Sequence, residues 1–448
     1  MSIAGASSLP QVIIVSPQFP PSTLAGVHRA RHLAKHLPSA GWEPTVVCVD
    51  EAYHEGHLDP ALDELVARHT RRIRTGALPV RFMRPLGIGD LGLRAYRQLR
   101  RTVLDLVRQR RADVVLITGA PYYPMLMAGA LRARGVPVVL DFQDPWVSRW
   151  GANQTPFSKA GLSHRLGTWL EPRVLAEANF ITSVSEVQNR QLMERHAWLD
   201  HTRLAAIPIG GDPLDFAHLR RRPCSLAAGL LAEDRINLSF VGTFADRFVP
   251  AMCALLAGAR RLRNDDAHAA QRIRLNFIGT SAQMDEAHVP CRVRALAEDA
   301  GIAEMVYEFP RRLPYLDALS VMARSDGLLL IGSDEPHYTA SRVLPALMSD
   351  RPYLSLYHAD SSANAILKAA GGGIALTFSD EDDLRQSEAA IGAALRTLAF
   401  APAECGSADP AAYAAHTARS VAGRFGAIFD QLTMRRCASV AGRANSIA

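Results

Sequence analysis

The segment from residue 11 to residue 50 constrains the fold more than any other part of this sequence. It opens with an apolar run, Val12 to Val15, that has the length of one buried strand. A Pro-rich loop with a single glycine, Gly26, leads into a helical pattern over 27–37, and a second apolar run follows at 45–49. Strand, loop, helix and strand together predict a βαβ unit. Since such units bind ligands at the carboxyl ends of their strands, and a glycine there lets backbone N–H groups approach a phosphate, the loop around Gly26 is a candidate binding site.

The same alternation continues through the first half of the chain and restarts in the second half. Two series of alternating strands and helices predict an α/β protein with two doubly wound, Rossmann-like domains that face each other across a cleft. The predicted boundaries are an N-terminal domain at 1–215, a linker at 216–235, a C-terminal domain at 236–400, helices at 401–434 and a tail at 435–448. The predicted strands are 12–16, 45–49, 113–118, 137–141, 179–184, 204–209, 238–244, 274–280, 305–315, 327–332, 352–358 and 371–378.

Composition excludes several classes of protein. The 448 residues are too many for one core, and no apolar stretch reaches the roughly 18–20 residues that span a bilayer. The six cysteines lack CxxC spacing, which argues against a zinc cluster or a disulfide framework. The first residues lack a charged segment and a cleavage site of the secretory type. We therefore expect a cytoplasmic protein.

Positive charge is concentrated between residues 68 and 111, where thirteen arginines face only two acids, Asp90 and Asp105. Within this stretch, 93–107 has apolar residues at helical spacing with arginines on the other faces. Two interpretations stay open: a solvated basic helix, or a surface that docks on the anionic inner face of a membrane. Nucleic acid is a poor candidate partner, because aromatic residues make up only 7% and no recognition motif occurs.

Five strings occur in order along the chain. They are FPPSTLAGVHRARHLAKHLPSAGWEPTVV (19–47), DFQDPW (141–146), LEPRVLAEANFITSVSE (170–186), IPIGGDPLDF (207–216) and SRVLPALMSDRPYL (341–354). Together they resemble the motifs of one bacterial branch of glycosyltransferase family 4. The resemblance implies the GT-B fold and an enzyme that moves a sugar from a nucleotide-sugar donor to a glycan or lipid-linked acceptor. It also implies retention at the anomeric carbon, no metal ion or other cofactor, and a role in cell-surface polysaccharide synthesis.

The resemblance places three candidate catalytic residues. Arg247 follows the strand 238–244, and Arg342 opens a later helix; both occupy positions where the family carries basic residues near the diphosphate. The departing nucleoside diphosphate carries at least two negative charges, and arginine pairs well with phosphate oxygens. Asp144, just after the strand 137–141, is the best acidic candidate, although it could equally cap the segment that follows.

Further residues are candidates for donor binding. Gly26 lies in the first loop, Thr243 at the end of the strand 238–244, and Ser341 at the start of the helix that carries Arg342. Asp334 and Glu335 precede that helix and could contact the donor ribose.

Two departures from the family pattern affect ribose recognition. Pro345 occupies the position of the family's ribose-binding glutamate, and His337 stands where a second acid would be expected. A proline side chain cannot accept a hydrogen bond from a ribose hydroxyl, although it is tolerated in a first helical turn. Ribose recognition has therefore been rebuilt, moved to Asp334 or Glu335, or lost. Two alternatives to a transferase stay open: a non-catalytic GT-B partner module and a GT-B nucleotide-sugar epimerase.

Three histidines, His28, His32 and His36, recur at every fourth position of the first predicted helix. Two histidines at that spacing can bind zinc. No carboxylate or cysteine lies next to them in the sequence, and they flank an apolar stripe, so we interpret them as structural and expect no metal site.

Overall fold

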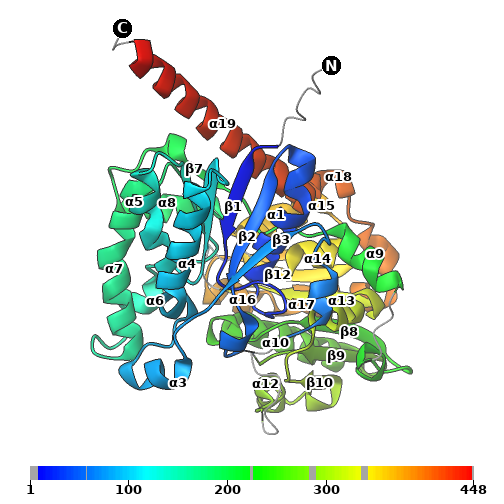
Figure 1. The fold of residues 1–448 in the computed structure, drawn as a ribbon. Coiled ribbons are helices and arrows are strands. Elements are labelled where there is room, and N and C mark those ends of the chain that lie inside the picture. The colour runs from blue at the N-terminus through cyan, green and yellow to red at the C-terminus, as the bar shows by residue number, and fades with distance from the viewer. Residues whose placement is uncertain (1–8, 57, 222–225, 282–288, 334–341, 446–448) are drawn as a thin grey trace, which may run out of the picture. The chain divides into compact units, whose positions relative to one another are not determined.

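The computed structural model describes residues 9–445 except 57, 222–225, 282–288 and 334–341 (Figure 1). The chain forms two compact units. Unit 1 comprises Met1–Gly210 and Ala418–Ala448, and unit 2 comprises Gly211–Thr417. The last helix of the chain therefore belongs to the same unit as the N-terminal residues.

Unit 1 is built on a seven-stranded parallel sheet in the order β3-β2-β1-β4-β5-β6-β7. The winding reverses between β1 and β4, so the carboxyl ends of these two strands form the position where doubly wound sheets bind ligands. The strands are β1 (Gln11–Val15), β2 (Glu43–Val49), β3 (Arg71–Thr75), β4 (Val114–Gly119), β5 (Val138–Phe142), β6 (Phe180–Ser183) and β7 (Leu204–Ala206).

Strand β3 was not predicted from the sequence. It consists of RRIRT and pairs in parallel with β2, with Thr45 opposite Arg71 and Val49 opposite Thr75. An edge strand has a free side, where charged side chains are common, so it lacks the apolar run that marks the central strands. Part of the arginine-rich stretch is therefore an edge of the sheet.

Alternate residues of the unit 1 strands enter two different buried clusters, one on each face of the sheet. Both faces of the sheet are therefore covered by helices. Ile13 and Val15 belong to one cluster, and Val12 and Ile14 belong to the other. This explains why the central strands have continuous apolar sequences. The helices are α1 (Val27–His36), α2 (Ala61–Glu64), α3 (Val80–Met83), α4 (Leu91–Arg108), α5 (Ala128–Arg132), α6 (Arg149–Ala152), α7 (Lys159–Glu177), α8 (Glu186–Arg195) and α19 (Ala418–Asn445).

Helix α4 is the amphipathic helix predicted at 93–107, and its apolar side faces the protein interior. Leu99 and Val103 are fully buried in the core, and Leu106 is nearly so. The apolar stripe therefore packs in the core, and docking of this arginine-rich stretch on a membrane stays a prediction.

A buried ion pair fixes α1 to the sheet. Arg29 Nε lies 3.2 Å from a carboxylate oxygen of Asp141, the residue before the end of β5, and both side chains are fully buried. Arg29 also donates to the backbone carbonyls of Pro208, at 3.0 Å, and Ile207. The hydroxyl of Thr182 donates to the second carboxylate oxygen of Asp141 at 2.7 Å. Burial raises the pKa of Asp141, and the Arg29 charge and the hydrogen bonds oppose that shift.

The last helix, α19, completes the core of unit 1 beside α1. The Trp42 indole donates to Asp430 at 3.0 Å, and its ring meets Phe429 edge-on at 5.2 Å. The Arg29 guanidinium lies 5.2 Å from the centre of the Phe425 ring. The chain thus uses residues near its end to cover the first βαβ unit.

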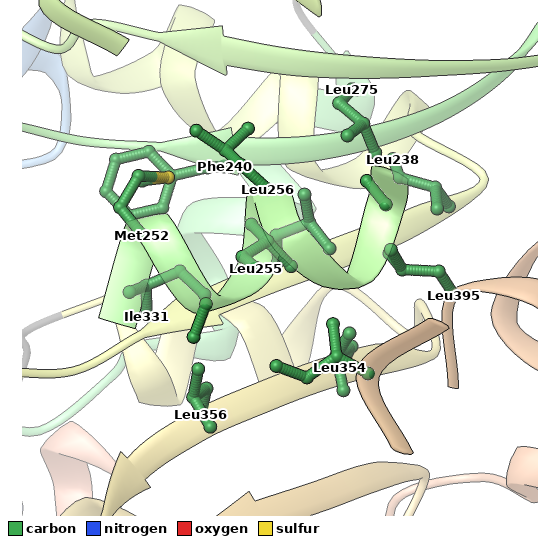
Figure 2. Packing of buried hydrophobic residues seen from close by; sticks show 14 of the residues in the cluster. Leu238, Phe240, Met252, Leu255, Leu256, Leu275, Ile331, Leu354, Leu356 and Leu395 are labelled. Carbon is green, nitrogen blue, oxygen red and sulfur yellow. The ribbon is translucent and has the colours of Figure 1, made fainter. Parts of the chain in front are cut away.

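Unit 2 has a six-stranded parallel sheet in the order β10-β9-β8-β11-β12-β13, with the reversal between β8 and β11. Its core packs helix α10 (Val249–Asp265) against the sheet; Figure 2 shows Met252 and Leu255 among leucines of the strands. The strands are β8 (Ile236–Val241), β9 (Ile273–Ile278), β10 (Val306–Phe309), β11 (Gly327–Ile331), β12 (Tyr353–His358) and β13 (Gly373–Phe378). The remaining helices are α9 (Pro213–Arg221), α11 (Ala267–Arg272), α12 (Arg292–Asp299), α13 (Tyr315–Arg324), α14 (Val343–Met348), α15 (Ser362–Ala370), α16 (Glu381–Gln386), α17 (Glu388–Phe400) and α18 (Pro410–Tyr413).

Two segments differ from their predicted character. The segment proposed as a linker at 216–235 includes most of α9, which is joined to α13 by a hydrogen bond from the Tyr315 hydroxyl to Asp215 at 3.1 Å. The predicted tail from residue 435 continues α19 as far as Asn445. The mixed charge and the two prolines of residues 210–235 suggested a linker, because sequence composition does not reveal tertiary hydrogen bonds.

Within the described residues, no helix is both long enough and apolar enough to cross a bilayer.

We expect Arg29→Met to lower the free energy of unfolding of unit 1 by about 3–5 kcal/mol, because it leaves a buried carboxylate without its partner. Chemical denaturation followed by tryptophan fluorescence measures this selectively, since all five tryptophans lie in unit 1. They are residues 42, 146, 150, 169 and 198.

The matched control is Arg132→Met, which removes an exposed ion pair with Glu177 at 3.5 Å and should cost no more than about 1 kcal/mol. The double variant Arg29→Met/Asp141→Asn should be less destabilised than the sum of the two single changes. Equal losses from Arg29→Met and Arg132→Met would show that the buried pair does not hold α1.

Candidate functional site

The unit 1 part of the candidate site lies where the first loop meets the ends of β4 and β5. Gly26 is the N-cap residue of α1, with no side-chain cap and no acid in the first turn of the helix. A Cβ at Gly26 would lie 3.5 Å from Gln143 Oε1 and 3.8 Å from the Ala120 carbonyl oxygen. Gln143 is buried, and within the described part of the chain its Oε1 has no hydrogen-bond partner. The structure thus brings Gly26 next to an unsatisfied polar atom at the switch point of the sheet.

Asp144 lies beside this place but differs from its neighbour Asp141. Its side chain is exposed, and its backbone carbonyl accepts a hydrogen bond from the Tyr122 hydroxyl at 2.8 Å. The Tyr122 ring stacks on Trp146 at 5.2 Å between ring centres. Asp144 is therefore held at the surface by an aromatic pair, and its role as a catalytic acid or base stays a prediction.

The first helix brings an arginine between two of its three histidines. Arg31 Nη2 lies 3.2 Å from His28 Nδ1 and 2.8 Å from His32 Nε2. A guanidinium thus occupies the space between the two rings that a bridging zinc ion would need.

In unit 2, Arg342 comes to the carboxyl end of β8. Its guanidinium carbon lies 4.4 Å from the centre of the Phe240 ring. A Cβ at Gly242 would lie 2.9 Å from Arg342 Nη1, and Gly242 has φ of 138°, which only glycine readily adopts. Nη1 of Arg342 is buried and has no hydrogen-bond partner among the residues that the structure describes. A buried guanidinium N–H without an acceptor is costly, so this end of β8 is suited to receive an anion.

Arg247 lies close to Arg342, since both guanidiniums lie near the Phe248 ring. Its guanidinium carbon is 5.3 Å from the centre of the Phe248 ring, and that of Arg342 is 5.6 Å from the same centre. Arg247 is exposed, whereas Arg342 is half-buried. Two positive charges around one aromatic ring form a cationic corner, which we define as Arg247, Arg342 and Phe248.

Thr243 lines a cavity of about 340 Å³ beyond the end of β8. Thr280 and Ser281, which follow β9, also line it, together with Arg292 at the start of α12. Arg292 forms an ion pair with Asp246 on the same cavity wall. The cavity thus has hydroxyl groups and an ion pair within reach of a small polar ligand.

A buried carboxylate supports the cavity wall. Glu308, in β10, accepts hydrogen bonds from the Thr280 hydroxyl and from the backbone N–H of Arg294 at 2.7 Å. Burial raises the pKa of Glu308, and these hydrogen bonds oppose the shift. Glu308 therefore holds both the start of α12 and the hydroxyl of Thr280 in position through these two hydrogen bonds.

Three predicted site residues, Asp334, Glu335 and Ser341, lie outside the described residues, as does His337. Pro345 is the third residue of α14, and the N–H of Ala346 still bonds to the Arg342 carbonyl at 2.9 Å. The helix thus tolerates this proline, as the sequence predicted.

Thr280 was not predicted as a site residue, although a repeated string in the sequence indicates it. Strands β8 and β9 end in the similar strings FVGT (240–243) and FIGT (277–280), and both glycines have positive φ. The second threonine, Thr280, lies in the cavity with the first. Gln143 was noted only as a departure from the family string, and its burial next to Gly26 follows from the fold.

We expect Gly242→Ala to weaken the binding of inorganic pyrophosphate by at least about tenfold, or about 1.4 kcal/mol, because the new Cβ displaces Arg342 Nη1. Isothermal titration calorimetry measures the affinity.

The matched control is Gly301→Ala, which also places alanine at a positive φ, of 71°, but meets no atom within 4 Å. Both changes strain the backbone of unit 2, and only the first touches Arg342. If both variants bind pyrophosphate like the parent, the end of β8 is not the anion site.

Comparison with known proteins supports the architecture. Residues 25–210 match the family model described as "Glycosyl transferase 4-like domain". A search of the curated proteins finds no match to this sequence. Among solved structures, a glycosyltransferase from Rickettsia africae ESF-5 matches with a TM-score of 0.59 and 13% identity, over 95% of this chain and 98% of that chain.

Two further structures cover nearly the whole chain. Anabaena HepE, solved in complex with UDP and glucose, matches with a TM-score of 0.59 and 13% identity, over 94% of this chain and 100% of its own. Sucrose-phosphate synthase from Thermosynechococcus elongatus matches with a TM-score of 0.60 and 15% identity, over 95% and 100%. At these identities the structures establish the fold. This chain therefore has the two-domain GT-B fold, and its residues 25–210 are similar to a glycosyltransferase 4-like domain.

Proposed function

We propose that this protein is a glycosyltransferase that moves a sugar from a nucleotide-sugar donor to a glycan or lipid-linked acceptor during cell-surface polysaccharide synthesis in the cytoplasm. We propose further that it retains the anomeric configuration and needs no metal ion. The family match of the first half and the GT-B fold of the whole chain support a transferase. HepE, one of the similar structures, is solved with UDP and glucose, which supports a nucleotide-sugar donor.

The observation that carries this proposal is the unpaired Nη1 of Arg342 at the end of β8. Its guanidinium is held by the Phe240 ring and by the space that Gly242 leaves. An anionic oxygen of a diphosphate would supply the missing acceptor. Since a charge-assisted hydrogen bond in a site closed to water is strong, this group would stabilise the leaving diphosphate as the glycosidic bond to it breaks.

Arg247 would add to that stabilisation from the exposed side of the cationic corner. Its position at the start of α10 lets the partial positive charge of the helix act in the same direction. Thr243 and the hydroxyl-lined cavity would then contact the part of the donor next to the diphosphate. In this arrangement the diphosphate charge is neutralised by protein groups, and one of its own oxygens can accept the proton of the acceptor hydroxyl.

In unit 1, Gly26 and Gln143 would contact the acceptor. The free Oε1 of Gln143 can accept a hydrogen bond from a sugar hydroxyl, and a glycine at position 26 leaves room for it. Asp144 stays a candidate for the acid or base on this side. We assign the acceptor to unit 1 and the donor to unit 2.

We expect one nucleoside diphosphate among UDP, GDP and ADP to raise the melting temperature of unit 2 in scanning calorimetry. At a hundred times its dissociation constant it should stabilise the protein by about 2.7 kcal/mol. Arg342→Ala should weaken its binding roughly 10- to 150-fold, the equivalent of a charged hydrogen bond of about 1.5–3 kcal/mol.

Arg263→Ala is the matched control, since Arg263 lies on α10 but pairs with Glu304 at 2.8 Å. It should leave nucleotide binding unchanged. If none of the three nucleotides raises the melting temperature, the result would favour the non-catalytic partner module that Pro345 suggests. Conversion of a nucleotide sugar without an added acceptor would instead identify an epimerase.

A further inference from the structure

One face of helix α7 is apolar and points to solvent. Leu162, Leu166 and Trp169 recur at intervals of four and three residues, so they form one stripe, and each is exposed. The opposite side of the helix, with Leu170, Val174 and Leu175, is buried in unit 1. An amphipathic surface helix normally turns its apolar stripe inward, whereas α7 has apolar residues on both sides.

The segment that leads into α7 adds two large aromatic residues to this surface. Phe157, just before the N-cap Ser158, is 82% exposed, and Trp150 on α6 is 63% exposed. Helix α6 packs against α7, and the two lie together in Figure 1. Exposed side chains of this size gathered on one surface indicate an interaction site.

A third segment, the turn after α3, reaches the same end of α7. A Cβ at Gly89 would lie 3.7 Å from Lys159 Nζ, the first residue of α7. Helix α3 carries Phe82, and the turn after it carries Leu86, both strongly exposed. Figure 1 shows α3 at the same end of unit 1 as α6 and α7. We call the combined area of Phe82, Leu86, Trp150, Phe157 and the α7 stripe the aromatic surface.

Positive charge borders the aromatic surface. Lys159 and Arg165 lie on α7 and are exposed, and within the described residues no ion pair joins either of them to a carboxylate. The guanidinium carbon of Arg173 lies 3.8 Å from the centre of the Trp169 ring, and that of Arg81 lies 4.7 Å from the centre of the Phe82 ring. The rings of Trp169 and Phe82 thus each have a guanidinium stacked on them.

Negative charge is scarce in the same segments. Residues 76–89 contain no acid, and residues 145–176 contain only Glu171. Glu171 is buried and binds Arg195 at 3.0 Å and His196 at 2.9 Å, so it does not reach the surface. The exposed Glu55 lies beside the segment 80–86, where it is ion-paired with Arg84. Exposed tryptophan, phenylalanine and leucine bordered by an excess of lysine and arginine match the chemistry of a membrane interface that carries anionic lipid.

We propose that the aromatic surface is a docking site for an anionic lipid bilayer. Trp150, Phe157 and Trp169 insert at the level of the headgroups, and Lys159, Arg165 and Arg173 contact lipid phosphates. The inference is independent of nucleotide binding, since every residue that carries it lies in unit 1. Docking of the arginine-rich stretch at 68–111 stays a separate prediction, and the aromatic surface shares with that stretch the segment 80–86.

The test is co-sedimentation of the full chain with vesicles of phosphatidylcholine alone and with vesicles that contain a third of phosphatidylglycerol. We expect binding to the anionic vesicles at low salt, with a blue shift of tryptophan fluorescence, and much weaker binding to the neutral ones. Raising the salt concentration to about 0.5 M should weaken the binding, because it screens the cations. The variant Phe157→Ser/Trp169→Ser should bind anionic vesicles at least tenfold more weakly than the parent.

The matched control is Trp198→Ser, which removes a tryptophan of similar exposure, 51%, from outside the aromatic surface. It should bind vesicles like the parent. Unchanged circular dichroism melting and nucleotide binding of the double variant confirm that it is folded, so a loss of vesicle binding then refers to the surface itself. Lys159→Glu/Arg165→Glu should lower vesicle binding as well, without removing any apolar group.

Three results would overturn the proposal: no binding of the parent to anionic vesicles at low salt, equal binding to neutral and anionic vesicles, or equal losses from Trp198→Ser and the double variant. A fourth would reassign the surface to a second copy of the chain. In that case analytical ultracentrifugation would show a dimeric parent, a monomeric Phe157→Ser/Trp169→Ser variant and no vesicle binding by either. Failure of the nucleotide screen would leave these outcomes unaffected, so the two proposals are tested separately.

Discussion

The buried pair of Arg29 and Asp141 is the interaction on which the first half of this structure depends. It connects α1 to the end of β5, and through the carbonyls of Ile207 and Pro208 it also holds the last segment of the sheet. Removing two charges from water is costly, and that cost is offset only when the partners and hydrogen bonds are complete. Here the Arg29 guanidinium is met by a carboxylate and two carbonyls, and Asp141 is also met by Thr182. The start of α1, and with it Gly26, is fixed by this network.

Arg342 offers an instructive contrast with Arg29. Both are large side chains close to the carboxyl end of a central strand, and both pack on a phenylalanine ring. The donors of Arg29 are directed at protein acceptors, whereas Nη1 of Arg342 is buried and unpaired. A residue whose hydrogen bonds are complete serves the fold, and one with a donor left over is arranged for something that the chain itself does not provide. This difference is why we assign structure to one arginine and leaving-group binding to the other.

The sequence predicted the elements that carry their own signal. The central strands were recognised because they are buried on both faces and apolar throughout. Arg247 and Arg342 were chosen through the family resemblance, and their role at the diphosphate stays a prediction. Strand β3 was missed because its RRIRT sequence is that of an edge, where only backbone pairing with β2 defines a strand. Asp144 was chosen as the acidic candidate because it follows the strand 137–141, and Asp141 was not considered. Only the fold shows that the acid inside the strand is the one that binds Arg29. The cavity beside Thr243 depends on Thr280, Ser281 and Arg292, which are brought together by packing across some 50 residues of chain.

The exposed face of α7 shows where the assignment of periodic apolar residues to the core is wrong. Apolar residues at helical spacing predict a buried face, and for Leu99 and Val103 of α4 that prediction is correct. The same rule applied to α7 would bury Leu162, Leu166 and Trp169, yet Leu170, Val174 and Leu175 already fill the inner side of that helix. A helix has one inner face, so the second stripe is left for another environment. Its neighbours are cations, and its own residues are two leucines and a tryptophan. An environment that suits both combines negative charge with an apolar interior, which is the property of a membrane surface. The arginine-rich stretch and the α7 stripe therefore act together only because the turn after α3 lies beside the start of α7.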